Sequence, residues 1–143
     1  EAFILLNREF DPSPLTHEMA KSMLSRLSLL GPEMVVITGV SLMGGPPRAN
    51  IAFDKKRGAF WLCACNYVPV SYPGTGDLFA AVLTGGLLWG DSLPIALNRA
   101  TFFTESAVKT TYGYGSDTRD GVMLEKILGN LTHHDIFSSY EIL

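Results

Sequence analysis

Apolar residues recur at helical spacing early in the chain and then give way to a short continuous apolar run. Ser13-Pro14 is typical of a helix start, with serine as the cap and proline at the first helical position. Gly31-Pro32 predicts the end of that helix. Its apolar positions are Leu15, Met19, Leu24 and Leu27. The run at residues 34–38 (MVVIT) then predicts a strand that is buried on both faces, as in a parallel sheet. This order of elements favours an α/β protein.

Two further strands are expected at residues 49–54 and 59–65, joined by a hairpin turn at 55–58. Gly58 allows the turn a positive φ, and Lys55-Lys56-Arg57 is expected to be its solvated tip. Residues 66–73 contain two prolines and form a connection. These features predict three convincing strands, whereas a doubly wound sheet has about five or more. Either the fold is small, or the chain is part of a larger domain.

Three segments in the second half of the chain predict helices. The helix after Gly76 is apolar nearly all round, so we expect it to be central and buried. The pair Gly85-Gly86 within it costs helix propensity and indicates close packing by another backbone. The next helix is capped by Asp91 or Ser92, ends before Tyr112, and has inner positions Leu93, Ala96, Leu97, Ala100, Thr104, Ala107 and Val108. Asp120 is expected to cap a last amphipathic helix with Leu124, Ile127, Leu128 and Leu131 inward.

Length and composition indicate one domain over residues 1–143, with 132–143 as a weakly patterned tail. The chain has 47% hydrophobic and 17% charged residues, which favours a globular protein over a disordered one. The net charge of -3 provides no basic stripe, so nucleic-acid binding has little support. The apolar run from Leu78 to Gly90 is too short to span a membrane. The chain opens with Glu1 and has no apolar leader, so no signal peptide is expected.

The two cysteines, Cys63 and Cys65, are two positions apart in a predicted strand. Their side chains would point the same way along one backbone, so they cannot easily bridge each other. We interpret them as reduced core residues of a cytosolic protein. A metal site is the alternative for such a pair, but the chain has no second pair of cysteines.

The stretch Gly74-Thr75-Gly76-Asp77 carries the candidate chemistry. A helix N-terminus has unpaired N–H groups and partial positive charge, and neighbouring glycines let an anion approach them. Backbone donors can stabilise a transferring phosphoryl group, while an adjacent carboxylate accepts the proton of an attacking hydroxyl. The alternative is ordinary helix-start chemistry, with Thr75 as the cap and Asp77 favoured by the dipole. The stretch is neither a Walker A motif nor a dinucleotide fingerprint.

A family resemblance appears in four segments of the chain. Residues 73–100 (PGTGDLFAAVLTGGLLWGDSLPIALNRA) resemble the signature region of the ribokinase-like superfamily, most closely its pyridoxal kinase branch. The start, EAFILL, resembles the segment after Thr-Pro-Asn-x-x in an N-x-x-E motif, with Glu1 as its glutamate. Residues 34–40 resemble the strand that ends at the nucleotide phosphates, and residues 117–128 are similar to the closing helix of bacterial pyridoxal kinases.

The resemblance implies a ribokinase-like fold and a kinase that uses ATP and Mg²⁺ to phosphorylate the 5'-hydroxymethyl group of pyridoxal, pyridoxine or pyridoxamine. It implies Asp77 as general base, and Glu1 as a Mg²⁺ ligand through water. The anion hole would be formed by the N–H groups of Gly74, Thr75 and Gly76. Thr38 and Gly39 would lie near the ATP phosphates. Candidates for the adenine pocket are Tyr67, Val68, Pro69 and the loop 112–121. A cytoplasmic homodimer is also implied.

The resemblance covers only the C-terminal half of such kinases, which explains the missing strands. The absent half would supply most of the vitamin pocket, so we expect the 143-residue chain alone to be inactive. A hydroxymethylpyrimidine kinase is an alternative, although that branch usually has cysteine at the position of Asp77. A sugar kinase, or a non-catalytic fragment that binds nucleotide or dimerises, also stays open.

Further expectations concern single residues. Arg48 comes after the glycine–proline loop and is a candidate for ATP contact. His17, His133 and His134 are expected to be exposed rather than metal-bound. Phe60, Trp61 and Trp89 are expected to contribute packing rather than base stacking.

Overall fold

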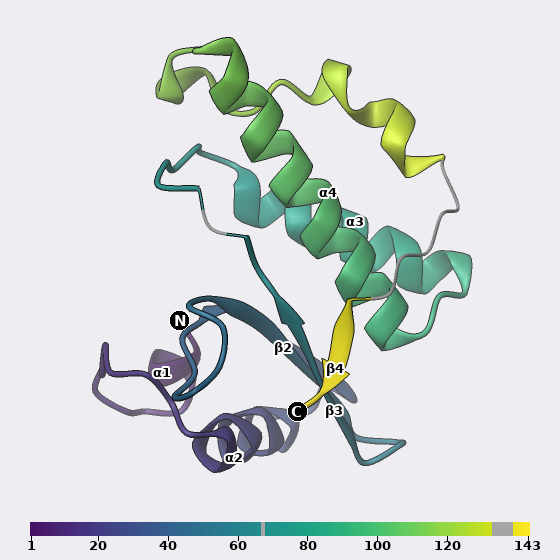
Figure 1. Ribbon diagram of the computed structural model, residues 1–143. Coiled ribbons are helices and arrows are strands. Elements are labelled where there is room, and N and C mark those ends of the chain that lie inside the picture. Colours follow the sequence, from purple (N-terminus) through teal and green to yellow (C-terminus); the bar gives the residue numbers. More distant parts are fainter. Residues whose placement is uncertain (67, 133–138) are drawn as a thin grey trace. The chain divides into compact units, whose positions relative to one another are not determined.

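The computed structural model describes residues 1–66, 68–132 and 139–143 (Figure 1). The chain forms two compact units, residues 1–65 with 139–143 and residues 66–138. Each unit is described by itself, and the expectation of a single domain stays a prediction. Tyr67, His133 and His134 lie outside the described residues. No described helix combines the length and apolar character that are needed to cross a membrane.

The first unit contains a four-stranded sheet with the strand order β1-β2-β3-β4. Its strands are β1 (Met34–Val40), β2 (Ala49–Asp54), β3 (Ala59–Ala64) and β4 (Tyr140–Ile142). Two helices, α1 (Ala2–Leu5) and α2 (His17–Ser28), belong to the same unit. Helix α2 packs against β1 and β2 (Figure 1). Its Met23 and Leu24 are buried in the core of this unit.

The α/β class is confirmed, but the described strands pair antiparallel. The apolar run at residues 34–38 predicts a strand in a parallel sheet, buried on both faces. Instead Val35 is buried, whereas Met34 and Thr38 are exposed, and β1 ends the strand order. The short connection 41–48 reverses the chain, which is enough for antiparallel neighbours but too short for a parallel crossover.

Helix α2 begins later than its sequence predicts. Thr16 is the N-cap, and its Oγ1 accepts a hydrogen bond from the Met19 N–H at 3.1 Å. The prediction that the helix starts at Ser13-Pro14 is therefore wrong. The reason lies at Leu15, whose N–H donates to the Ser41 carbonyl at 2.8 Å as part of a β-bridge to Leu42. That bridge holds the backbone extended at Leu15 and delays the helix.

The β2–β3 hairpin agrees with its sequence prediction. Gly58 has a φ of 62°, and the tip residues Lys55, Lys56 and Arg57 are exposed. Phe53 and Phe60 stack across the hairpin with ring centroids 4.3 Å apart. The expected packing role of Phe60 is thus confirmed.

The second unit is built on two helices that pack against each other, α3 (Thr75–Trp89) and α4 (Leu93–Tyr114). Helix α4 runs through Tyr114 rather than ending before Tyr112. The buried residues of α3 are Phe79, Val82 and Gly86. Leu88 and Trp89 are 84% and 82% exposed, so the prediction of a helix buried all round, with Trp89 in packing, is wrong for this chain. Helix α4 covers one face of α3, and an apolar composition does not specify what covers the others.

After α4 the described residues form three short 3₁₀ helices, η1 (Thr118–Asp120), η2 (Leu124–Lys126) and η3 (Leu128–Leu131). The prediction of one amphipathic helix that starts at Asp120 is therefore wrong. Gly121 has a φ of 76°, which interrupts the helical backbone. The Met123 N–H donates to Thr111 Oγ1 at 2.9 Å instead of to a helical carbonyl.

Candidate active site

The candidate active site is centred on the first turn of α3, where Asp77 lies as predicted. Gly74 is the N-cap residue, and its φ of 82° places it in the left-handed region that glycine tolerates. The Leu78 N–H donates the first helical hydrogen bond, to the Gly74 carbonyl at 2.9 Å. The N–H groups from Gly74 to Asp77 therefore have no helical acceptor. They form a cluster of donors at the positive end of the helix.

The backbone at this turn is open to a ligand. A Cβ built on Gly74 or Gly76 would meet no atom within 4 Å. The Thr75 hydroxyl donates to the Tyr72 carbonyl at 3.1 Å, and no side chain caps the helix. The alternative in which Thr75 is the cap is therefore wrong. Asp77 is also exposed, and it lies in the same helical turn as the open N–H groups.

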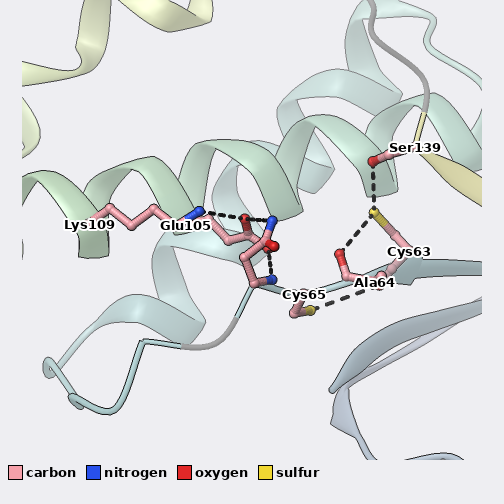
Figure 2. Close-up of polar contacts among 7 residues, drawn as sticks. Cys63, Ala64, Cys65, Glu105, Lys109 and Ser139 are labelled. Atoms are coloured by element: carbon pink, nitrogen blue, oxygen red, sulfur yellow. Dashed lines mark hydrogen bonds and ion pairs between the residues drawn. The ribbon is translucent and has the colours of Figure 1, made fainter. Parts of the chain in front are cut away.

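The connection that leads to this turn is anchored by Glu105 of α4 (Figure 2). Glu105 accepts hydrogen bonds from the Asn66 N–H at 2.7 Å and from Asn66 Nδ2 at 3.1 Å. Lys109 lies one turn further along α4, with its Nζ 3.6 Å from Glu105 Oε2. Val68, two residues beyond Asn66, is half-buried. The anchor thus fixes the start of the segment that carries Val68 and ends at Gly74.

Glu105→Ala is expected to lower the free energy of unfolding by about 1 kcal/mol, because two hydrogen bonds from the exposed Asn66 to a carboxylate are lost. Lys109→Ala is the matched control on the same helix. Its ion pair is half-exposed and should contribute less than about 0.5 kcal/mol. Urea unfolding of both variants measures the difference. Equal losses would show that Glu105 contributes no more than a surface charge.

The segment 112–121, whose first three residues belong to α4, contains a well-defined ion pair. Arg119 Nη2 lies 2.8 Å from Asp117 Oδ2, and the Arg119 N–H donates to Asp117 Oδ1 at 2.9 Å. Side-chain hydrogen bonds from Arg119, and to a smaller extent its N–H, lower the pKa of the Asp117 carboxyl. The same side-chain contact raises the pKa of Arg119. Both groups therefore stay charged at neutral pH.

A groove of about 980 Å³ in the first unit is lined by the candidate residues of that unit. Glu1, Thr38 and Gly39 line it together, and so does Arg48. Asp11 lies on the same groove, and the pKa of its carboxyl is lowered by the hydrogen bonds from Ser13, first from its N–H. Within the described residues, no group of three or more side chains has the makings of a complete metal site.

The candidate residues divide between the two units. The first unit holds Glu1, Thr38 and Gly39, and the second holds Val68, Gly74, Thr75, Gly76 and Asp77. In the first unit the three residues line one groove, and in the second Gly74 to Asp77 share the start of α3. Sequence reasoning missed Glu105, because an isolated glutamate inside a helix has no recognisable motif.

Neither Cys63 nor Cys65 is in a disulfide within the described residues, as expected for reduced thiols (Figure 2). Cys63 is buried, with its Sγ 3.8 Å from Ser139 Oγ. Trp61 packs edge-on against Tyr140 with centroids 5.6 Å apart, which confirms its packing role. His17 is exposed at the start of α2, also as expected.

Comparison with known proteins identifies similar molecules. A family model described as phosphomethylpyrimidine kinase matches residues 1–121. No curated protein sequence matched the chain. A candidate phosphomethylpyrimidine kinase from Bacteroides thetaiotaomicron is 40% identical over 100% of this chain and 49% of its own, with a TM-score of 0.93. A second crystal form of that protein, described as containing pyridoxal, gives a TM-score of 0.91 and 40% identity over 100% of this chain and 50% of its own.

Two pyridoxal kinases are also similar. The enzyme from Lactobacillus plantarum is 29% identical over 92% of this chain and 46% of its own, with a TM-score of 0.75. The enzyme from Leishmania donovani, in complex with ADP and pyridoxamine, is 19% identical over 88% of this chain and 44% of its own, with a TM-score of 0.70. At that identity the likeness shows the fold alone. The chain spans about half the length of these proteins.

Proposed function

Because the chain belongs to the phosphomethylpyrimidine kinase family, we propose that the complete protein transfers the γ-phosphate of ATP to the 5'-hydroxymethyl group of pyridoxal, pyridoxine or pyridoxamine. The observation that carries this proposal is the start of α3, where open N–H groups and the Asp77 carboxylate share one turn. The 40% identity to a protein described with pyridoxal supports the choice of substrate.

The proposed chemistry depends on the groups in that turn. During phosphoryl transfer, negative charge spreads over the equatorial oxygens of the moving group. The N–H groups of Gly74, Thr75 and Gly76 would donate hydrogen bonds to those oxygens, and the positive end of α3 adds to their effect. The Asp77 carboxylate would accept the proton of the attacking hydroxyl and raise its nucleophilicity.

The remaining candidates would hold the nucleotide. We propose that Thr38 and Gly39 contact the ATP phosphates and that Val68 lies against the adenine. Mg²⁺ is commonly held by one or two carboxylates together with substrate phosphates and waters, and it neutralises phosphate charge when bound. The exposed Glu1, on the same groove as Thr38, fits such a site through water. The resemblance also supports a cytoplasmic homodimer, and sedimentation of the complete protein tests its oligomeric state.

A hydroxymethylpyrimidine kinase is the second candidate, because both the matching family and the Bacteroides relative are described as phosphomethylpyrimidine kinases. Asp77 favours the pyridoxal assignment, since the other branch usually has cysteine at this position. A sugar kinase or a non-catalytic, nucleotide-binding or dimerising fragment is a further alternative.

A substrate comparison tests the proposal. We expect the complete protein, supplied with ATP and Mg²⁺, to have a kcat/KM for pyridoxal at least about 10-fold above that for hydroxymethylpyrimidine. The two substrates differ in their OH and NH groups, and a substrate that leaves polar groups of the site unpaired loses transition-state binding. ADP release measures both, with ribose as the sugar control. A preference for hydroxymethylpyrimidine would assign the second candidate. Absence of both turnover and ATP binding by calorimetry would favour a non-catalytic role.

A further inference from the structure

The end of β1 contains a β-bulge at two of the candidate ATP-binding residues. Ile37 pairs with Ile51, and Val40 pairs with Ala49, so Thr38 and Gly39 together stand opposite a single residue of β2. Such a bulge places one extra residue in one strand and locally interrupts the ladder of hydrogen bonds. Gly39 has a φ of 68°, the left-handed conformation that is typical of glycine in a bulge.

The residue opposite this bulge is Asn50, and its side chain replaces part of the interrupted ladder. Asn50 Oδ1 accepts a hydrogen bond from the Gly39 N–H at 3.0 Å. Asn50 is only 6% exposed, so its amide is held among neighbouring groups rather than by bulk water. A buried acceptor of this kind fixes the orientation of the peptide that donates to it. The left-handed turn at Gly39 is thus set from β2.

The bulge also presents the two residues to the groove. Thr38 and Gly39 are exposed, and both line the groove that Glu1 and Arg48 line. An unbulged strand would return one of these residues to the ladder and reverse the direction of the side chains beyond it. The geometry therefore makes the presentation of Thr38 depend on the hydrogen bond to Asn50.

We propose that Asn50 is a positioning residue for nucleotide binding, which holds the Thr38–Gly39 bulge in the conformation that receives the ATP phosphates. This inference rests on the proposed kinase function. The neutral amide suits the task, because it accepts the Gly39 N–H without adding a negative charge beside a polyphosphate. Aspartate would keep an acceptor but add that charge.

The matched control for Asn50 is Asp54, on the same strand. Asp54 is also 6% exposed, and its Oδ1 accepts the Arg57 N–H at 3.1 Å in the β2–β3 turn. Asn50→Ala and Asp54→Ala each remove a part-buried hydrogen bond between a side chain and a backbone N–H. The first variant loses the hydrogen bond at the Gly39 bulge, and the second loses the hydrogen bond in the β2–β3 hairpin.

Steady-state kinetics of the complete protein test the proposal. Asn50→Ala is expected to raise the KM for ATP about 10-fold or more, with the KM for pyridoxal changed less than about twofold. Both alanine variants are expected to lower the unfolding midpoint, but Asp54→Ala should leave the KM for ATP unchanged. Asn50→Asp, which keeps the acceptor, covers the case in which the alanine variant does not fold, and should also raise the KM for ATP. Equal ATP effects at positions 50 and 54 would overturn the proposal.

Amide hydrogen exchange without nucleotide provides a second, independent readout. Asn50→Ala should speed exchange of the Gly39 N–H at least about 10-fold relative to wild type, whereas Asn50→Asp and Asp54→Ala should leave it slow. Unchanged Gly39 exchange in Asn50→Ala would overturn the positioning role. If wild type shows no kinase turnover, the proposed function fails, and the exchange data still decide whether Asn50 fixes the bulge.

Discussion

Replacing Asp77 with asparagine is expected to lower the kcat of the complete protein by a factor of about 10² or more, with ATP binding retained. Asparagine has nearly the same size and shape as aspartate, but its amide cannot take the proton of the attacking hydroxyl. The N–H groups at Gly74, Thr75 and Gly76 remain in the variant. The loss therefore reports proton transfer rather than phosphate binding.

A stability measurement must accompany this assay, because Asp77 also lies in the first turn of α3. A carboxylate there interacts favourably with the helix dipole by about 0.3–1 kcal/mol. Asp77→Asn should lower the free energy of unfolding by no more than that amount. The control is Glu125→Gln, which replaces an exposed carboxylate in η2. This variant should change neither the kcat nor the free energy of unfolding. Unchanged turnover in Asp77→Asn would leave this carboxylate with its helix-start role alone.

Local sequence chemistry predicted the parts of the molecule that depend on a few adjacent residues. The start of α3 reflects a glycine, Gly74, that tolerates a left-handed backbone and an aspartate favoured in the first turn. The β2–β3 hairpin depends in the same way on Gly58, whose φ is 62°. In both cases the residues that determine the conformation lie within the turn itself.

The missed features depend on residues far apart in the chain. Ser13-Pro14 has the chemistry of a helix start, yet the bridge between Leu15 and Leu42 holds that segment extended. The Gly39 bulge likewise becomes visible only when β1 is paired with β2 and Asn50 stands opposite it. A single sequence contains no register between strands, so these features could not be derived from it.

The glycine pair in α3 combines a confirmed and a wrong expectation. In the sequence both glycines indicate close packing, but the structure separates them. A Cβ on Gly86 would lie 3.1 Å from Asp91 Oδ2 and 3.3 Å from Ala96 Cβ, whereas a Cβ on Gly85 would meet no atom within 4 Å. Asp91 is also fixed by Arg99, whose Nε lies 2.9 Å from the same oxygen. The close approach of α4 therefore needs glycine at position 86 only.

Gly86→Leu is therefore expected to destabilise the protein, and Gly85→Leu to stabilise it. Leucine at position 86 must displace Ala96 or break the Asp91–Arg99 pair, and such overpacking costs about 1–3 kcal/mol. Leucine at the open position 85 gains helix propensity of up to about 1 kcal/mol over glycine. The two variants should then differ by about 1–4 kcal/mol in the free energy of unfolding. Urea midpoints, compared at equal slope, measure this difference. Matching midpoints would mean that α4 can move away from α3 at little cost, and that the tight contact at Gly86 does not hold the two helices together.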